Sequence, residues 1–433
     1  MAAVEEDPLP KPRFSPEEVL KHLEDIPEGK RTFSSTNFLK ALTSQRETWT
    51  AIKALKQNEE NATLADFDRV ILLFLKNIYH LVSGLPGALM FDALEDLMAN
   101  SGILTPFIRR MVKIDESVAL ELGLPSKEDA LCDNQQELIR VAATAIVCFY
   151  HYTNYPAHPD VFPSDDATLL FTSLALDSCR DRTASATLSA QLAEQGGGLL
   201  GLGEIRWLMH YVRGQLLGLT GAVFLSLGDK EKHKQHLLAQ QADFLGLIKA
   251  VPENPASYGY YVRTCLQFQQ LSAAGLFAAK GAVVAAKQNS PFYGAQLAAQ
   301  RAIVLAFAGG GTSSTGSGAS EVSAAAKAAA ARLGAPAAEP APAEPVALVR
   351  AGELRALSTQ AREGLETERT GLPEVYADLV VLDPVDSKLL DERLGPMLQG
   401  VPDDGEVLAV TDLLYPTFAP TALPRGAVAI AKP

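Results

Sequence analysis

Residues 205–227 read IRWLMHYVRGQLLGLTGAVFLSL, and their apolar side chains recur every three or four positions. This spacing places one apolar stripe along a helix of about six turns. The stripe consists of Ile205, Leu208, Val212, Leu216, Leu219, Val223 and Leu227. An apolar face of that length has to be buried against other helices. Because similar patterns continue to Phe307, the sequence predicts several long helices in series that present a surface rather than hold a reagent.

Composition limits the kind of partner. The 433 residues are 47% hydrophobic and carry a net charge of −13, so a sizeable core is available and a nucleic-acid partner is not expected. The cysteines at 132, 148, 179 and 265 form no C-x-x-C pair, which argues against a zinc site or a dense disulfide framework. No apolar run reaches the roughly 18 residues that cross a bilayer. We expect a soluble cytoplasmic protein.

Helix start and stop signals predict further helices over most of the chain. Ser15-Pro16-Glu17-Glu18 is a typical helix start, and Pro291 begins another helix. The expected helices cover 35–57, 64–83, 88–99, 103–122, 135–152, 165–179, 205–227, 230–250, 258–288, 291–307 and 346–369. The tail from Leu372 is rich in proline and contains the β-type run Val375–Val381. The predicted fold is mainly all-α, an elongated curved stack of helix pairs resembling tetratricopeptide repeats, with a small β or extended segment near the C-terminus.

Changes in composition suggest the domain limits. Residues 1–13 are charged and rich in proline, which predicts an irregular arm. Residues 308–345 are rich in Gly, Ser, Ala and Pro and lack the apolar residues needed for ordering, which predicts a flexible low-complexity insertion. We expect one helical domain over 14–425 and a short tail over 426–433.

The chemistry-bearing residues form no catalytic pattern. His151 and His158 flank a tyrosine-rich turn but lack the H-E-x-x-H spacing of a metal site. Gly196 to Gly203 precede a helix, yet the Gly-Lys-Ser/Thr ending of a phosphate loop is missing, so a hinge or linker is expected. We therefore predict no catalytic residue, no metal site and no cofactor.

The order of features from Lys230 onwards resembles a known family. A basic turn, Lys230-Glu231-Lys232-His233-Lys234, is followed by HLLAQQADF at 236–244 and a helix rich in small residues up to Lys287. After the low-complexity segment, a helix ending in Glu366-Thr367-Glu368-Arg369 leads into Leu372-Pro373-Glu374-Val375-Tyr376. This succession resembles the BRO1 domain of ESCRT adaptors, and in particular its single-domain BROX-type members, over roughly residues 30–380.

The resemblance implies a partner and a site. BRO1 domains bind the C-terminal amphipathic helix of ESCRT-III subunits of the charged multivesicular body type in a concave apolar groove, as expected for helix-in-groove recognition. The candidate partner-binding residues are Leu169, Leu170, Phe224, Leu237 and Leu238, with a basic rim of Lys230, Lys232 and Lys234. The family also implies association with endosomes, and the lysines could contact anionic lipid at a membrane surface.

Plainer interpretations of the same residues stay open. The five apolar residues could all belong to an ordinary core, and the lysines could form a solvated loop that simply carries charge. The whole chain could also be a generic α-helical scaffold or a structural subunit of a larger complex without an ESCRT link. A BRO1 domain should expose one apolar strip, whereas a subunit should expose broad apolar patches.

Overall fold

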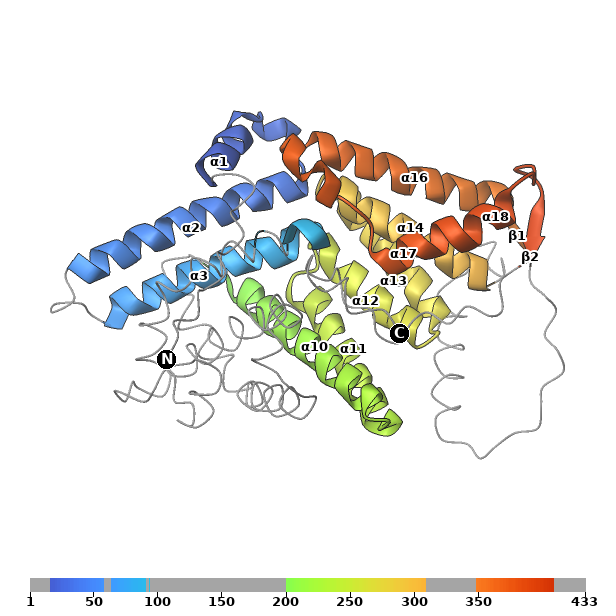
Figure 1. Cartoon of the computed structure of the whole chain (residues 1–433), viewed down its shortest axis with the longest axis horizontal. Helices are drawn as coiled ribbons and strands as arrows, with labels where there is room; N and C mark the ends of the chain where they lie inside the picture. The colour runs from blue at the N-terminus through green and yellow to red at the C-terminus, as the bar shows by residue number, and fades with distance from the viewer. Residues whose placement is uncertain (1–15, 58–63, 91–92, 94–199, 309–347, 409–433) are drawn as a thin grey trace, which may run out of the picture.

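The computed structural model describes residues 16–57, 64–90, 93, 200–308 and 348–408, and it is predominantly helical (Figure 1). The N-terminal helices are α1 Pro16–Asp25, η1 Glu28–Lys30, α2 Phe33–Gln57 and α3 Leu64–Gly84. The central helices are α10 Leu202–Ser226, α11 Lys230–Ala250, α12 Pro255–Gln267, α13 Leu271–Lys287 and α14 Pro291–Ala308. The C-terminal elements are β1 Leu348–Arg350, α16 Ala351–Thr370, η4 Glu374–Leu379, α17 Pro384–Lys388, η5 Leu389–Leu394, α18 Gly395–Leu398 and β2 Glu406–Leu408.

Helices that follow one another in the described parts of the chain pack side by side. α2 pairs with α3, α10 with α11, α12 with α13, α13 with α14, and α14 with α16. Figure 1 shows the α2–α3 pair reaching out at one end and α14 and α16 at the other, with α10 to α13 between them. The all-α class is therefore confirmed, while the likeness to the BRO1 domain stays a prediction. The expected helices at 103–122, 135–152 and 165–179 lie outside the described residues.

Aromatic side chains join the α2–α3 pair to the central helices. The Trp207 ring of α10 meets Tyr79 of α3 edge-on at 5.5 Å and stacks on Tyr211 at 5.3 Å. Tyr211 in turn contacts Tyr260 of α12 at 5.4 Å, and the Trp207 indole donates to Ser257 Oγ at 2.7 Å. Tyr79, Trp207 and Tyr211 are buried and Tyr260 is partly buried, so these rings contribute much of the apolar area that holds three helices together.

Three turns between consecutive helices share one geometry. Gly228, Gln269 and Asn289 each follow a helix end with φ of 80°, 54° and 50°. In each turn the next N–H bonds back to a carbonyl five residues earlier, as in Gln270 N to Cys265 O at 2.8 Å. This is the Schellman motif, which normally uses glycine at the left-handed position. The predicted single helix over 258–288 is therefore wrong, because the chain turns at Gln269 and forms α12 and α13.

The segment after α16 departs from the sequence prediction. The β-type run Val375–Val381 was expected to be extended, but Glu374–Leu379 forms the 3-10 helix η4. Tyr376 and Leu379, three residues apart, are the buried side chains of this turn. The small sheet exists elsewhere, since β1 pairs antiparallel with β2 from Leu348–Leu408 to Arg350–Glu406. Residues 348–350 of the helix predicted over 346–369 form β1 instead.

We call residues 371–401 the C-terminal strap, because they run back along α16 and α14 (Figure 1). Its anchor is a buried ion pair between Arg263 of α12 and Asp383, with 2.6 Å between Nη1 and Oδ2. Asp383 also caps α17 by accepting from the Val385 N–H, and Gln300 of α14 donates to the buried Asp386 at 3.3 Å. These contacts fix the strap on two central helices.

Candidate partner-binding surface on the α10–α11 hairpin

The hairpin of α10 and α11 carries most of the candidate residues, and glycines allow its two helices to approach closely. A Cβ at Gly214 would lie 2.2 Å from the Phe244 ring, and a Cβ at Gly246 would lie 2.6 Å from the His210 ring. A larger residue at either position would force the facing ring or the helices to shift. The close contact depends most on Gly214, because the Phe244 ring that it faces is buried, whereas the His210 side chain is 39% exposed.

Polar contacts fix the register of the two helices. His233 Nδ1 lies 2.7 Å from the Gly221 carbonyl, and because a carbonyl only accepts, this nitrogen carries the proton. Gln240 donates to the Gly214 carbonyl at 2.9 Å. The buried Asp243 accepts from Arg213 Nε at 3.1 Å and lies 3.0 Å from His210 Nδ1. The contacts run antiparallel from the turn towards the far end of the hairpin.

The five candidate apolar residues separate into different environments. Leu237 is 2% exposed and belongs to the core, so its side chain is not available to a partner, and its place on the proposed surface is corrected. Leu238, the next residue, is 45% exposed. Phe224 is half-buried, with the His236 ring 5.0 Å away and Lys232 Nζ 5.0 Å from its ring centre. Leu169 and Leu170 lie outside the described residues.

The three candidate lysines are exposed at the start of α11. Lys232 pairs with Asp229 at 3.3 Å, and the Asp229 carboxylate also accepts from the Lys232 N–H as the N-cap of the helix. That backbone hydrogen bond is the main reason why the pKa of Asp229 is lowered. Lys232 is thus engaged within the turn, whereas Lys230 and Lys234 have no ion pair among the described residues.

Two exposed leucines of the same hairpin were not among the candidates. Leu225 is 39% exposed and Leu227 is 50% exposed, although the sequence placed Leu227 on the buried stripe. Leu208 and Val212 of that stripe are buried as expected. Gly228 is the sequence signal that could have predicted the exposure of Leu227. A glycine at this position indicates the helix end, and beyond the end of α10 the apolar stripe no longer packs against a partner helix.

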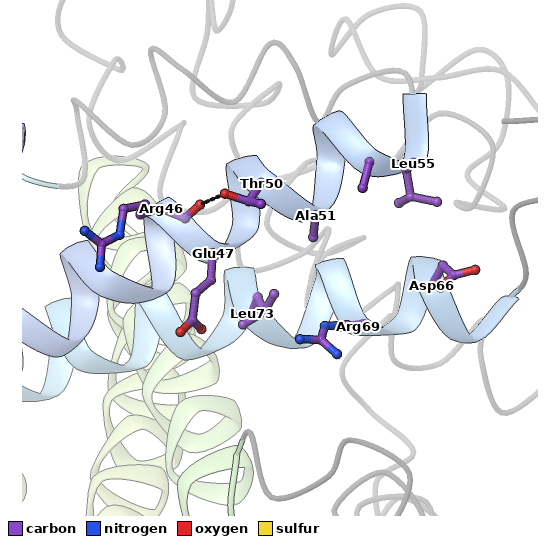
Figure 2. A pocket seen from close by; sticks show the side chains of 9 residues that line it. Arg46, Glu47, Thr50, Ala51, Leu55, Asp66, Arg69 and Leu73 are labelled. Atoms are coloured by element: carbon purple, nitrogen blue, oxygen red, sulfur yellow. Dashed lines mark hydrogen bonds between the residues drawn. The ribbon is translucent and has the colours of Figure 1, made fainter. Parts of the chain in front are cut away.

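A separate cleft of about 560 Å³ opens between α2 and α3. Figure 2 shows Arg46 and Glu47 on α2 and Asp66 and Arg69 on α3 around it. Its floor includes Ala51, Leu55 and Leu73. The two arginines and two carboxylates balance in charge, and the Thr50 hydroxyl in the lining donates to the Arg46 carbonyl at 2.9 Å, so the cleft points to no particular chemistry.

Cys265, the cysteine among the described residues, is buried. Burial raises the pKa of the Cys265 thiol to about 11, so it is protonated at neutral pH and is a poor nucleophile. Within the parts of the chain that the structure describes, His, Cys, Asp and Glu nowhere gather as a group of three that could hold a metal ion. None of the helices in those parts is long and apolar enough to span a bilayer.

Comparisons with known proteins give no relative: no family model, curated protein or solved structure matches this chain.

Proposed function

We propose that this chain is a non-catalytic protein-binding module of the BRO1 type, which binds the C-terminal amphipathic helix of an ESCRT-III subunit in endosomal sorting or membrane remodelling. The specific partner comes from the order of sequence features after Lys230. The observation that carries the proposal is the 45% exposure of Leu238. The preceding residue, Leu237, is buried, and their helix α11 packs against both α10 and α12. An exposed leucine on a rigid helix is a suitable contact for a partner helix.

The surroundings of Leu238 favour such a contact. Gln241, one turn further along α11, donates to Gln270 in the α12–α13 turn at 2.9 Å. Residues three apart share a helix face, so Leu238 lies on the side of α11 next to this turn. Lys234 lies one turn before Leu238 on the same face and can attract acidic residues of the partner.

A titration tests the proposal directly. Fluorescence anisotropy with labelled C-terminal helix peptides of ESCRT-III subunits should show saturable binding to the full chain, with a dissociation constant in the range of roughly 1–100 μM. Leu238→Asp should weaken binding at least tenfold, because it puts a charge into the apolar contact. Circular dichroism should show unchanged helix content, since the side chain is already exposed.

Leu276→Asp is the matched control, because Leu276 is a leucine of similar exposure, 36%, on a different helix, α13. It should leave the affinity unchanged. Equal losses in both variants, or no saturable binding of any ESCRT-III helix, would rule out the proposed site.

A structural subunit of a larger complex is the second candidate, and a separate observation favours it. Leu276 and the 56% exposed Val283 lie seven residues apart on one face of α13. If the chain is such a subunit, this face is buried in the complex, and the chain is a monomer only when it is separated from its partners. Co-purification in a stable complex that is lost in Leu276→Asp but kept in Leu238→Asp would support this candidate over the first.

A further inference from the structure

Three nitrogen-bearing side chains, Arg206, His210 and Arg213, lie on one face of α10. Successive residues of a helix are about 100° apart, so these three positions fall within an arc of about 60°. They follow one another over about 10 Å of the helix. Arg206 is exposed, and the side chains of His210 and Arg213 are 39% and 38% exposed. A ligand at the surface can therefore reach all three.

Asp243 of α11 orients two of these side chains. Its carboxylate is buried, with one oxygen 3.0 Å from His210 Nδ1 and the other accepting from Arg213 Nε at 3.1 Å. Because an ionised carboxylate only accepts, Nδ1 carries a proton, and Nε2 is the ring nitrogen left for another partner. Arg213 uses only Nε in this contact, so within the described residues its terminal N–H groups remain for a ligand.

Gly246 of α11 supports the His210 ring from below. A Cβ at this glycine would lie 2.6–2.7 Å from three atoms of the imidazole, so the ring lies flat against the backbone of α11. This packing and the contact with Asp243 together hold the ring in place before a ligand arrives. A preformed arrangement lowers the entropy cost of binding.

Positive charge exceeds negative charge at this face of α10. Asp243 is one carboxylate shared by two cationic side chains, and Arg206 has no ion pair among the described residues. Glu204 lies on another side of the helix, since burial and then Glu204 raise the pKa of Tyr79 on α3 to about 12. Two arginines against one carboxylate leave a charge of +1, which protonation of His210 raises to +2.

We propose that Arg206, His210 and Arg213 bind a phosphorylated serine or threonine of a partner peptide. A phosphate monoester carries a charge of about −1.5 to −2 and offers three acceptor oxygens, which match the charge and the number of these side chains. Arginine donates to phosphate through a planar fork of parallel N–H groups. The two arginines contact the phosphate from either side, and His210 donates from Nε2 in its protonated form. This site is independent of the contact at Leu238.

The shape and charge of the surface favour a peptide over other phosphate monoesters. The three side chains lie on an exposed helix face, whereas small-molecule sites are concave and enclose most of their ligand. An anionic bilayer would have to approach a whole chain of net charge −13, but a peptide has to reach only about 10 Å of one helix. Recognition of phosphorylated peptides by clustered arginines follows the same physical logic.

The probe is a capped, fluorescein-labelled heptapeptide of alternating glycine and alanine with phosphoserine at its centre, compared with the same peptide carrying unmodified serine. Anisotropy titrations use the full chain. The wild-type chain should bind the phosphopeptide saturably and at least tenfold more tightly than the serine peptide. Arg206→Glu should weaken binding at least tenfold, because repulsion replaces the paired N–H groups. Arg206→Lys should weaken it less, by about threefold, since the charge stays but the fork is lost.

Arg393→Glu is the matched control, because Arg393 is exposed on a different element, η5, and the substitution makes the same change of net charge. It should leave the affinity for the phosphopeptide intact. Circular dichroism should show unchanged helix content in Arg206→Glu, since the side chain is exposed. Leu238→Asp should not alter binding of the phosphopeptide, so failure here is distinct from failure of the ESCRT-III contact.

Several outcomes would overturn the proposal. These are equal binding of the two peptides, an equal loss in Arg393→Glu and Arg206→Glu, or no binding by the wild-type chain of any member of a phosphoserine library with random flanking residues. A last arm uses phosphatidylcholine vesicles with and without phosphatidic acid, whose headgroup is also a phosphate monoester. Sedimentation with the phosphatidic acid vesicles that is lost in Arg206→Glu, without binding of any phosphopeptide, would assign the site to a lipid instead.

Discussion

Glu368 accepts a hydrogen bond of 2.9 Å from the hydroxyl of Thr32, which lies 336 positions earlier in the chain. Its other oxygen accepts from the Phe292 N–H at 3.2 Å. One fully buried carboxylate near the end of α16 therefore contacts Thr32, the residue just before α2, and Phe292, the second residue of α14. Helix N-termini attract negative charge, which explains how a carboxylate is accommodated there. The contact ties the N-terminal helices to the C-terminal half of the fold.

Removing this carboxylate should loosen that junction. Glu368→Ala should lower the free energy of unfolding by about 3 kcal/mol, because it leaves a cavity and two buried donors without their acceptor. Glu368→Gln should cost about 1 kcal/mol or less, since the amide can still accept from Phe292 and donate to Thr32. Urea unfolding followed by circular dichroism measures both changes. Equal losses for the two variants would show that the hydrogen bonds at this junction contribute nothing.

Burial also raises the pKa of Glu368 above its ordinary value. A carboxyl group whose pKa is raised on folding stabilises the fold at low pH, and this contribution is lost as the pH rises through the folded-state pKa. The stability of wild type relative to Glu368→Gln should therefore fall as the pH rises above about 4.5, the ordinary value. Paired urea titrations between pH 4 and 7 would show this trend, and an opposite slope would contradict it.

His80 should give the opposite dependence on pH. Burial, with Lys40 and Lys76 nearby, lowers the pKa of His80 from 6.5 to about 3. The neutral ring lies 3.1 Å from Asn37 Oδ1, joining α3 to α2. Since the folded-state pKa is below the unfolded one, the stability is present above pH 6.5 and is lost as the pH falls towards 3. The expected slope is about 1.4 kcal/mol per pH unit. His80→Gln should remove that part of the slope, whereas a variant at the half-exposed His236 should keep it.

The left-handed backbone conformation at Gln269 should cost stability that a glycine would restore. A non-glycine residue in the left-handed region costs roughly 1 kcal/mol. Gln269→Gly should therefore raise the free energy of unfolding by about 0.5–1 kcal/mol, and Asn289→Gly should raise it less because asparagine tolerates this conformation. Gly228→Ala should lower it by about 1 kcal/mol. Thermal melts of the three variants would give this order, and a loss of stability in Gln269→Gly would contradict it.

The same turn shows which parts of the fold were readable from sequence. Helix limits at Gly228 and Pro291 carry local signals, because proline suits a helix start and glycine suits the left-handed position after a helix end. The start of α12 was predicted at residue 258, three residues after its true start at Pro255. Gln269 carries no such signal, so two helices looked like one. The β-branched run at 375–381 looked extended, yet packing of Tyr376 against Phe38 at 5.6 Å accompanies a 3-10 turn. Tertiary contacts overrode local preference there.

The candidate site was readable only in part, and for a geometric reason. Leu237 and Leu238 are adjacent and point about 100° apart around α11. The sequence does not say which of them faces the neighbouring helices, because that depends on how α10 and α12 pack on both sides.

The buried pair of Arg263 and Asp383 should hold the strap in place. Both side chains are nearly inaccessible, at 6% and 4% exposed, so removing one leaves the other charge buried. Arg263→Met should lower the free energy of unfolding by about 3–5 kcal/mol. Asp383→Asn should also destabilise the fold, and the double variant should cost clearly less than the sum of the single changes, because neither charge is then left without its partner.

Limited proteolysis can separate local release of the strap from global unfolding. If the ion pair holds residues 371–401 on α12, Arg263→Met should be cut within the strap well before the helices α10 to α14 are digested, since cleavage follows the population of locally open states. Arg362→Met is the matched control, because it removes an arginine that lies 75% exposed beside the same strap. It should leave the cleavage pattern unchanged. Equal protection of the strap in Arg263→Met and wild type would show that other contacts, such as Gln300 with Asp386, hold it without this pair.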